Sequence, residues 1–279
     1  MGNKRIGFIG GGKMAQSLIG GLVKSGMPPS DILVSEPQQI LRDKLKNEFA
    51  VAAFAENHAV ASQADVVVLA VKPQAMKEAL TSIKEAFSTR PVLIISIAAG
   101  IRIESIERWM GGSPAIVRVM PNTPALIGSG ISALYANERV DAEGKKVAQL
   151  ILSAVGATVW LDGEDKLDAV TAVSGSGPAY FFYLMEAIEA AAIAQGLDPE
   201  TARTLTIETA LGASKLAKAS NESVAALRKQ VTSPGGTTEA ALKRMQADSV
   251  FDSVVNAIAA AKTRSEELAA MLDTSSDNQ

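Results

Sequence analysis

In the first half of the chain, short apolar runs alternate with segments whose apolar positions recur every three or four residues. A short continuous apolar run is typical of a strand buried on both faces, and the longer period marks one face of a helix. Met14, Leu18 and Leu22 predict a helix that ends at Ser25-Gly26. The predicted strands are Arg5–Ile9, Asp31–Ser35, Asp65–Val71, Pro91–Ile97, Ala115–Met120, Ile131–Tyr135 and Ala157–Leu161, and the other predicted helices are Gln39–Phe49, Met76–Phe87, Ile103–Met110 and Asp141–Val155.

This alternation predicts an α/β fold, in which a parallel, doubly wound sheet of Rossmann type carries helices on both faces. The pattern changes near residues 162–165, and we expect no strand after that point. Residues 1–162 are therefore predicted to form a sheet domain, and residues 163–279 an all-helical domain. The helices predicted in the second domain are Lys166–Val173, Ala179–Gln195, Pro199–Ala217, Ser223–Val231, Thr238–Gln246 and Val250–Leu272.

Composition and charge exclude several classes of protein. The 279 residues are 47% hydrophobic and 20% charged, which is an ordinary globular composition. Cysteine is absent, so disulfide scaffolds, thiolate metal sites and cysteine nucleophiles are excluded, and we expect no metal site. The net charge of −3 comes without a long basic run, so we expect no nucleic-acid partner. No apolar stretch approaches the roughly 18 residues of a membrane span, and no signal-peptide pattern is present, so we expect a soluble cytoplasmic protein.

A glycine-rich turn lies between the first predicted strand and the first predicted helix. In its Gly-x-Gly-x-x-Ala pattern, Gly10 allows the tight turn, Gly12 lets the backbone approach a diphosphate, and Ala15 permits close packing of helix on strand. The free N–H groups at the helix start supply an anion site. This context predicts that the turn binds a dinucleotide, with Ile9, Gly10, Gly11, Gly12, Lys13 and Met14 as the contacting residues.

The end of the second strand does not decide between NAD and NADP. Glu36 lies close to the place where NAD enzymes carry an acidic residue for the ribose hydroxyls, and it could equally be a surface residue. Ser35 precedes it and could face a 2′-phosphate, while the nearest downstream arginine is Arg42.

Further polar or small residues follow the later strands, where ligands of such folds bind. Ala70, Val71, Lys72 and Pro73 follow one strand, and the small residues Ala98 and Ala99, which follow the next, would admit a nicotinamide ring. Asn122 and Thr123 lie between two prolines after the strand that ends at Met120. They could contact ligand or satisfy backbone groups.

Two loops rich in glycine and hydroxyl groups lead into helices in the second half of the chain. They span residues 174–180 and 232–239. Helix starts of this kind present N–H donors that suit a carboxylate. Capping by Ser176, Ser233 or Thr237 is the alternative interpretation, but capping does not require the tandem Gly235-Gly236, so anion binding is favoured.

Over essentially its whole length, the sequence resembles pyrroline-5-carboxylate reductase, the last enzyme of proline synthesis. The resemblance is carried by the signature from Leu227 to Gln246, together with the segments 70–73, 96–100, 120–124 and 174–180. It implies NAD(P)H-dependent reduction of the cyclic imine 1-pyrroline-5-carboxylate to L-proline. It also implies that the helical domain forms a homodimer, often within larger rings.

The resemblance also implies roles for individual residues. NADPH is the implied cofactor, with NADH as the alternative, and Ser35 and Asn57 fall where the family contacts the adenosine end and its 2′-phosphate. Glu36 departs from the residue usual there. The substrate loop maps onto Ser233, Gly235, Gly236, Thr237 and Thr238, with Ser176 from the other loop. We expect the N–H groups of Gly236 and Thr237 to hold the carboxylate, and the Thr238 hydroxyl to contact the ring nitrogen.

Thr238 is a poor general acid, so we assign it orientation of the substrate and expect the protonated imine to come from solution. Three alternatives remain open, one of which is a helical scaffold whose alanine-rich faces serve only assembly. A reductase of the β-hydroxyacid dehydrogenase type would need a lysine on the first long helix of the second domain, and Phe181–Gln195 contains none. A dinucleotide-binding regulator without turnover would not need the 233–238 loop.

Overall fold

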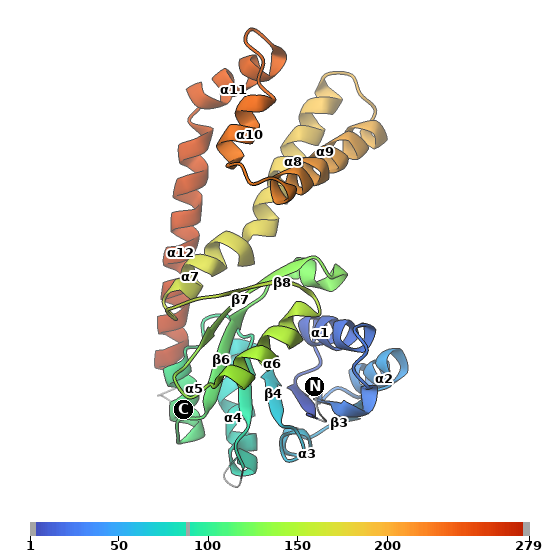
Figure 1. Cartoon of the computed structure of the whole chain (residues 1–279), viewed down its shortest axis with the longest axis vertical. Coiled ribbons are helices and arrows are strands. Elements are labelled where there is room, and N and C mark those ends of the chain that lie inside the picture. The colour runs from blue at the N-terminus through green and yellow to red at the C-terminus, as the bar shows by residue number, and fades with distance from the viewer. Residues whose placement is uncertain (1–3, 88–89, 276–279) are drawn as a thin grey trace. The chain divides into compact units, whose positions relative to one another are not determined.

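The computed structural model describes residues 4–87 and 90–275 (Figure 1). In these ranges eight strands form one sheet in the order β3-β2-β1-β4-β5-β6-β7-β8. The crossover between β1 and β4 marks the switch point at which such sheets bind ligands. The strands are β1 (Ile6–Ile9), β2 (Ile32–Ser35), β3 (Ala52–Phe54), β4 (Val66–Leu69), β5 (Leu93–Ser96), β6 (Ala115–Met120), β7 (Gly130–Ala136) and β8 (Gly156–Trp160).

The central strands of the sheet are buried on both faces, as the apolar runs predict. Val66 and Val68 of β4 pack into one core, whereas Val67 and Leu69 pack into the other. The first core is covered by α1 (Lys13–Lys24), α2 (Gln39–Phe49) and α6 (Ala142–Ser153), and the second by α3 (Asn57–Ala61), α4 (Met76–Ile83) and α5 (Ile103–Met110). The prediction of a doubly wound α/β fold is confirmed.

Two features of the sheet differ from the expectation. β7 pairs antiparallel with β6, because residues 121–129 are too few for the crossover that a parallel neighbour requires. Strand β3 was not predicted, since it is short and only partly buried at the edge of the sheet. Short 3₁₀ turns also occur at η1 (Pro29–Asp31), η2 (Pro73–Ala75), η3 (Lys84–Phe87) and η4 (Thr123–Ile127).

The remaining chain is helical, as predicted. Its helices are α7 (Lys166–Val170), α8 (Gly177–Ala194), α9 (Pro199–Ala219), α10 (Val224–Gln230), α11 (Thr237–Ala247) and α12 (Val250–Ser275). One predicted helix, Lys166–Val173, ends early as α7 and continues as a π-turn, η5 (Thr171–Gly175). None of the helices in the described ranges is long and apolar enough to cross a membrane.

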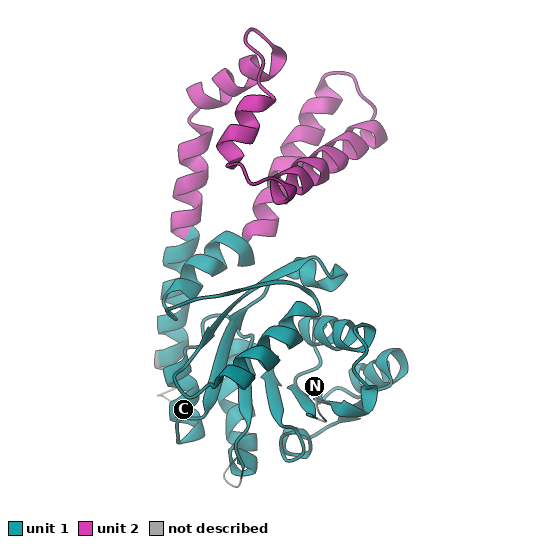
Figure 2. Ribbon diagram, viewed as in Figure 1, with its two compact units in different colours: residues 1–176, 261–279 teal, residues 177–260 magenta. Residues whose placement is uncertain are grey.

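The chain forms two compact units (Figure 2). Unit 1 comprises residues 1–176 together with 261–279, and unit 2 comprises residues 177–260. The chain therefore leaves the sheet unit after the π-turn and re-enters it within α12. This division differs from the predicted domains 1–162 and 163–279, which stay a prediction about functional parts of the chain.

Candidate functional site

The segments that follow β1, β2, β4 and β5 lie side by side at the carboxyl edge of the sheet. The Gly10 N–H donates to the Ser35 carbonyl at 2.9 Å, and the Ala70 N–H donates to the Ile9 carbonyl at 2.8 Å. The Ile97 N–H donates to the Leu69 carbonyl at 3.2 Å. The structure therefore brings together the glycine-rich turn and the residues after β2, β4 and β5, most of those predicted to bind a dinucleotide.

The geometry of the turn fits a diphosphate. Gly10 has a φ of +98°, and a Cβ there would lie 2.8 Å from the Ala70 carbonyl oxygen. Gly12 is the N-cap of α1, has no side-chain cap, and has no atom within 4 Å of the position of a Cβ. Gly10 is thus required by the fold, whereas Gly12 leaves open space in front of the helix N-terminus, as a bound diphosphate needs.

Glu36 is not a surface residue, because only 7% of it is exposed. Its carboxylate accepts the Gly11 N–H at 3.0 Å and the Gln38 N–H at 3.1 Å. The side chain therefore ties the glycine-rich turn to the end of β2. The structure therefore rules out the interpretation of Glu36 as a surface residue.

The adjacent positions form a second polar group. The Ser35 hydroxyl is buried and donates to Asn57 Oδ1 at 2.7 Å, and Asn57 Nδ2 donates to Ser82 Oγ at 3.0 Å. Arg42, which is six residues beyond Glu36, donates from Nη1 to the carbonyls of Glu36 and Pro37 at 2.7 Å each. The helix therefore brings the Arg42 guanidinium to the end of β2, although no arginine directly follows Ser35 and Glu36 in the sequence.

The residues after β4 and β5 differ in accessibility. Lys72 is exposed and is the N-cap residue of η2, whose first residue is Pro73. Ala98 is buried and Ala99 is exposed. Neither alanine presents a large side chain at the sheet edge, and their contact with a nicotinamide ring stays a prediction.

Asn122 satisfies backbone groups, which is the structural interpretation of the two that the sequence allowed. Its Nδ2 donates to the Ser174 carbonyl at 3.1 Å, and its Oδ1 accepts the Ile131 N–H at 2.9 Å. The π-turn η5 is thereby attached to the β6–β7 connection. Gly175 contributes to this contact, because a Cβ there would lie 2.4 Å from Met120 Cε.

In unit 2, the loop before α11 has a glycine as its N-cap. Gly236 makes no side-chain cap, so the capping by Ser233 or Thr237 considered from the sequence does not occur at this helix. The Gly236 N–H donates to the Ser233 carbonyl at 3.1 Å. Because the first N–H groups of a helix have no partner within it, Thr237 and Thr238 provide the N–H groups suited to a carboxylate.

A carboxylate already binds this loop. Glu239 Oε2 accepts the Gly235 N–H at 2.8 Å and lies 3.2 Å from Lys243 Nζ. Gly235 has a φ of +73°, which turns its N–H toward the helix start. The Glu239 side chain therefore satisfies the Gly235 N–H from within the first turn of α11. Its pairing with Gly235 was not predicted, although the spacing of four residues was visible.

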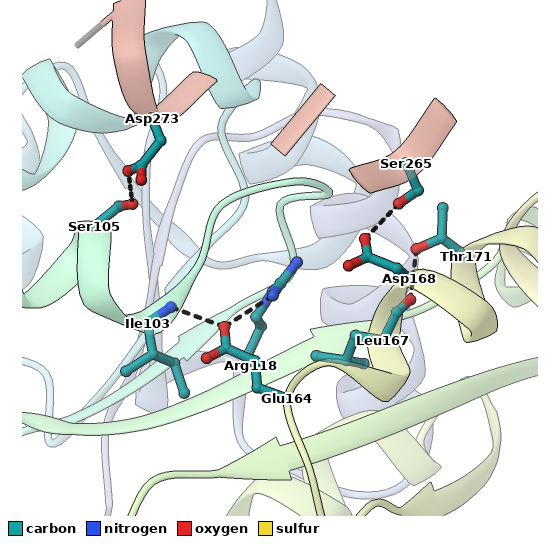
Figure 3. A network of polar contacts seen from close by, with 9 residues as sticks. All are labelled: Ile103, Ser105, Arg118, Glu164, Leu167, Asp168, Thr171, Ser265 and Asp273. Atoms are coloured by element: carbon teal, nitrogen blue, oxygen red, sulfur yellow. Dashed lines mark hydrogen bonds and ion pairs between the residues drawn. The ribbon is translucent and has the colours of Figure 1, made fainter. Parts of the chain in front are cut away.

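Unit 1 also contains a polar network that sequence analysis missed (Figure 3). Buried Arg118 of β6 donates from Nη1 to Glu164 Oε1 at 2.8 Å, and the same oxygen accepts the Ile103 N–H at 2.9 Å. Nearby, Ser265 Oγ of α12 donates to Asp168 Oδ1 at 2.6 Å. These contacts join β6, α5, α7 and α12, which are far apart in the sequence.

Comparisons with known proteins find relatives over nearly the whole chain. A family model described as "Pyrroline-5-carboxylate reductase dimerisation" matches residues 164–268, and one described as "NADP oxidoreductase coenzyme F420-dependent" matches residues 5–100. Pyrroline-5-carboxylate reductase of Pseudomonas aeruginosa is 51% identical over 98% of this chain and 99% of its own length. The Haemophilus influenzae enzyme is 43% identical over 96% and 98%.

Solved structures of the same kind match over nearly the whole chain. The pyrroline-5-carboxylate reductase of Coxiella burnetii has a TM-score of 0.92 at 42% identity and covers 95% of this chain and 98% of its own. The Plasmodium falciparum enzyme, solved with NADP bound, has a TM-score of 0.85 at 30% identity, covering 96% and 99%.

Proposed function

Because this chain belongs to the pyrroline-5-carboxylate reductase family, we propose that its glycine-rich turn and its 232–238 loop hold the two reactants of that family's reaction. The chain is an NAD(P)-dependent oxidoreductase of proline biosynthesis, which reduces 1-pyrroline-5-carboxylate to L-proline. The observation that carries the proposal is the pair of glycine N-caps, Gly12 and Gly236, neither of which has a side-chain cap.

The residues at the sheet edge bind and orient the dinucleotide in this proposal. The N–H groups at the start of α1, from Lys13 and Met14, bind the diphosphate, and Glu36 keeps the preceding turn in place through Gly11. Ala70–Pro73 and Ala98–Ala99 line the path toward the nicotinamide end. A bound nicotinamide cofactor supplies the hydride.

We propose that NADPH is preferred and that NADH is the weaker alternative. Glu36 directs its carboxylate to two N–H groups, which leaves the ribose end to Ser35, Asn57 and Arg42. A nearby arginine is the usual partner of a 2′-phosphate. Replacing Arg42 by alanine is expected to raise the KM for NADPH about tenfold and to leave that for NADH unchanged.

Lys46→Ala is the matched control, because Lys46 is an exposed cation one turn further along the same helix. Equal KM changes for NADPH and NADH in Arg42→Ala would contradict the assignment. Glu36→Ala tests the other residue of this turn. We expect it to weaken both cofactors similarly, because it would loosen the turn, and a selective gain for NADPH would show instead that Glu36 opposes the 2′-phosphate.

The 232–238 loop binds the acid in this proposal. The N–H groups of Thr237 and Thr238, together with the dipole of α11, hold the substrate carboxylate. This modifies the expectation from the sequence, since the Gly236 N–H is engaged by the Ser233 carbonyl. The remaining proposed contacts come from Ser233, Ser176 and Gly235, whose own N–H is held by Glu239 and which therefore contributes through the shape of the loop. The Thr238 hydroxyl orients the ring nitrogen.

The protonated imine is drawn from solution, so activity is expected to fall as the pH rises. A pH–rate profile of Thr238→Ala, with Thr238→Ser as the variant that keeps the hydroxyl, tests this point. If Thr238→Ala lost a basic-limb pKa that the wild type has, the proton would come from the enzyme.

We also propose that residues 163–279 act as the substrate-binding and dimerisation part of a homodimer, which assembles further into a ring. Unit 2 exposes neighbouring aromatic side chains on α8, including Phe181, Phe182 and Tyr183, at 62%, 64% and 76%. Large exposed apolar patches mark interaction surfaces. The mass of the native particle by light scattering tests this, and Phe182→Asp should lower it. A cytoplasmic location stays a prediction.

The reaction itself is tested by mixing the purified chain with NADPH and 1-pyrroline-5-carboxylate and following cofactor absorbance. Oxidation that depends on the substrate is expected. An absence of turnover, with dinucleotide binding intact, would favour a regulator instead.

A further inference from the structure

One buried carboxylate of unit 1 has no part in the function proposed above. Asp168 on α7 is 5% exposed, and its Oδ1 accepts the hydroxyl of Ser265, which is itself 7% exposed, at 2.6 Å. A carboxylate buried in this way is costly unless it is hydrogen-bonded. The contact joins residues that are 97 positions apart, so local helix formation does not account for it.

Asp168 lies one turn before the π-turn η5. Single π-turns are rare in helices and are frequent at functional sites. Here the Ser176 N–H donates to the Thr171 carbonyl at 2.8 Å, and the Thr171 hydroxyl donates to the Leu167 carbonyl at 2.8 Å. Asn122 attaches the far side of the same turn through the Ser174 carbonyl. The π-turn is therefore fixed at one end by the β6–β7 connection and at the other by Asp168.

Ser265 lies on α12 shortly after the chain re-enters unit 1 at residue 261. The Asp168–Ser265 hydrogen bond thus links the segment by which the chain leaves the sheet unit to the segment by which it returns (Figure 3). A second contact attaches α12 to unit 1 further along, where Ser105 donates to Asp273. That second contact is not next to the π-turn.

We propose that Asp168 is a positioning residue, which acts through its hydrogen bond with Ser265 to hold the π-turn and thereby the substrate-binding Ser176. The inference rests on the proposed substrate role of Ser176. Asp168 touches neither reactant in this account. Asp168 instead determines where the π-turn places Ser176, the residue directly after it.

The test compares two substitutions of the same kind on unit 1. Ser265→Ala removes the hydrogen bond to Asp168, and Ser105→Ala removes the one to Asp273. We expect Ser265→Ala to raise the KM for 1-pyrroline-5-carboxylate about tenfold, the factor that corresponds to one lost hydrogen bond to a charged group, with kcat and the KM for NADPH within about twofold of wild type. Ser105→Ala is expected to leave all three constants within that range.

Hydrogen exchange of the ligand-free protein gives a second readout, which does not depend on the substrate. Ser265→Ala should speed exchange in the peptide that covers residues 171–177 about tenfold, and Ser105→Ala should not. Asp168→Asn keeps an oxygen that can accept the Ser265 hydroxyl, so exchange of the 171–177 peptide should stay at the wild-type rate in this variant. Asp168→Ala loses that oxygen and should behave as Ser265→Ala does.

Unchanged exchange and an unchanged substrate KM in Ser265→Ala would overturn the proposal. An equal loss in Ser105→Ala would also overturn it, because the effect would then be general to α12. If the wild type did not reduce 1-pyrroline-5-carboxylate at all, the proposed function would fail, and the exchange data alone would decide whether Asp168 positions the π-turn.

Discussion

In the glycine-rich turn, the same substitution at two positions should affect different properties: Gly10→Ala the stability of the fold, and Gly12→Ala the affinity for the dinucleotide. Gly12→Ala adds a methyl group at the N-cap of α1, where φ is −66° and no atom lies within 4 Å of the new Cβ. Gly10→Ala adds the same group two residues earlier, where φ is +98° and the new Cβ would lie 2.8 Å from the Ala70 carbonyl oxygen.

The expected changes in the free energy of unfolding differ accordingly. At Gly12, the loss of a favourable cap residue, about 1 kcal/mol at most, is offset by an unfolded chain that is stiffer, by about 0.4–1 kcal/mol. At Gly10, the left-handed backbone costs about 1–2 kcal/mol and the end of β4 must move as well, so we expect about 3 kcal/mol or more. The melting temperature of Gly10→Ala should fall by about 5 °C or more.

Gly12→Ala should weaken dinucleotide binding although it leaves stability nearly unchanged. A methyl group in front of the helix start blocks the approach of the diphosphate to the N–H groups of Lys13 and Met14. Loss of such charge-assisted hydrogen bonds corresponds to a tenfold to hundredfold weaker Kd, or about 1.5–3 kcal/mol. Calorimetric titration with NADPH, beside thermal unfolding of the same samples, measures both quantities. Wild-type affinity in Gly12→Ala, or a loss of stability as large as that of Gly10→Ala, would refute the reasoning.

Two further predictions concern the polar network of unit 1. Glu164→Ala leaves Arg118 buried without its partner and should cost about 3 kcal/mol or more in denaturant unfolding, whereas Lys166→Ala, at an exposed ion pair, should cost less than about 1 kcal/mol. The hydrogen bond from Ser105, followed by that from Arg108, lowers the pKa of Asp273 below its ordinary value of 3.8. Because a lowered pKa gives stability that is fully present above the unfolded value and is lost as the pH falls through the lower folded value, the stability difference between wild type and Asp273→Asn should be constant near neutral pH and decrease once the pH falls below about 4; a difference that did not decrease on acidification would contradict this.

Local patterns in the sequence were sufficient for the sheet and for the glycine-rich turn. The run Val66–Leu69 predicted a strand buried on both faces, and its side chains alternate between the two cores. Gly10 and Gly12 were assigned different tasks from their spacing. The positive φ of Gly10 confirms the tight turn, whereas the approach of a diphosphate to Gly12 stays a prediction. These features depend on a few consecutive residues, so the chain specifies them locally.

Contacts between distant residues could not be predicted in the same way. Nothing near Asp168 in the sequence indicates that Ser265 will meet it, and Glu36 gave no sign that its carboxylate would turn toward Gly11. The π-turn was missed because residues 166–173 have an ordinary helical pattern, and its geometry is fixed by Asn122 from another part of the fold. The antiparallel β7 could have been predicted, since the length of the 121–129 link was already visible.

The sheet unit is assembled from two separate stretches of chain, and this affects how the protein is made. A ribosome delivers residues in order, so all of residues 177–260 emerge before the part of α12 that belongs to unit 1. Until then, the surface that Ala269 and Leu272 later cover beside Gly100 is open to water. The nascent sheet therefore exposes an apolar strip for the time needed to synthesise an entire helical insert, and a chaperone would have its best opportunity to bind during that interval.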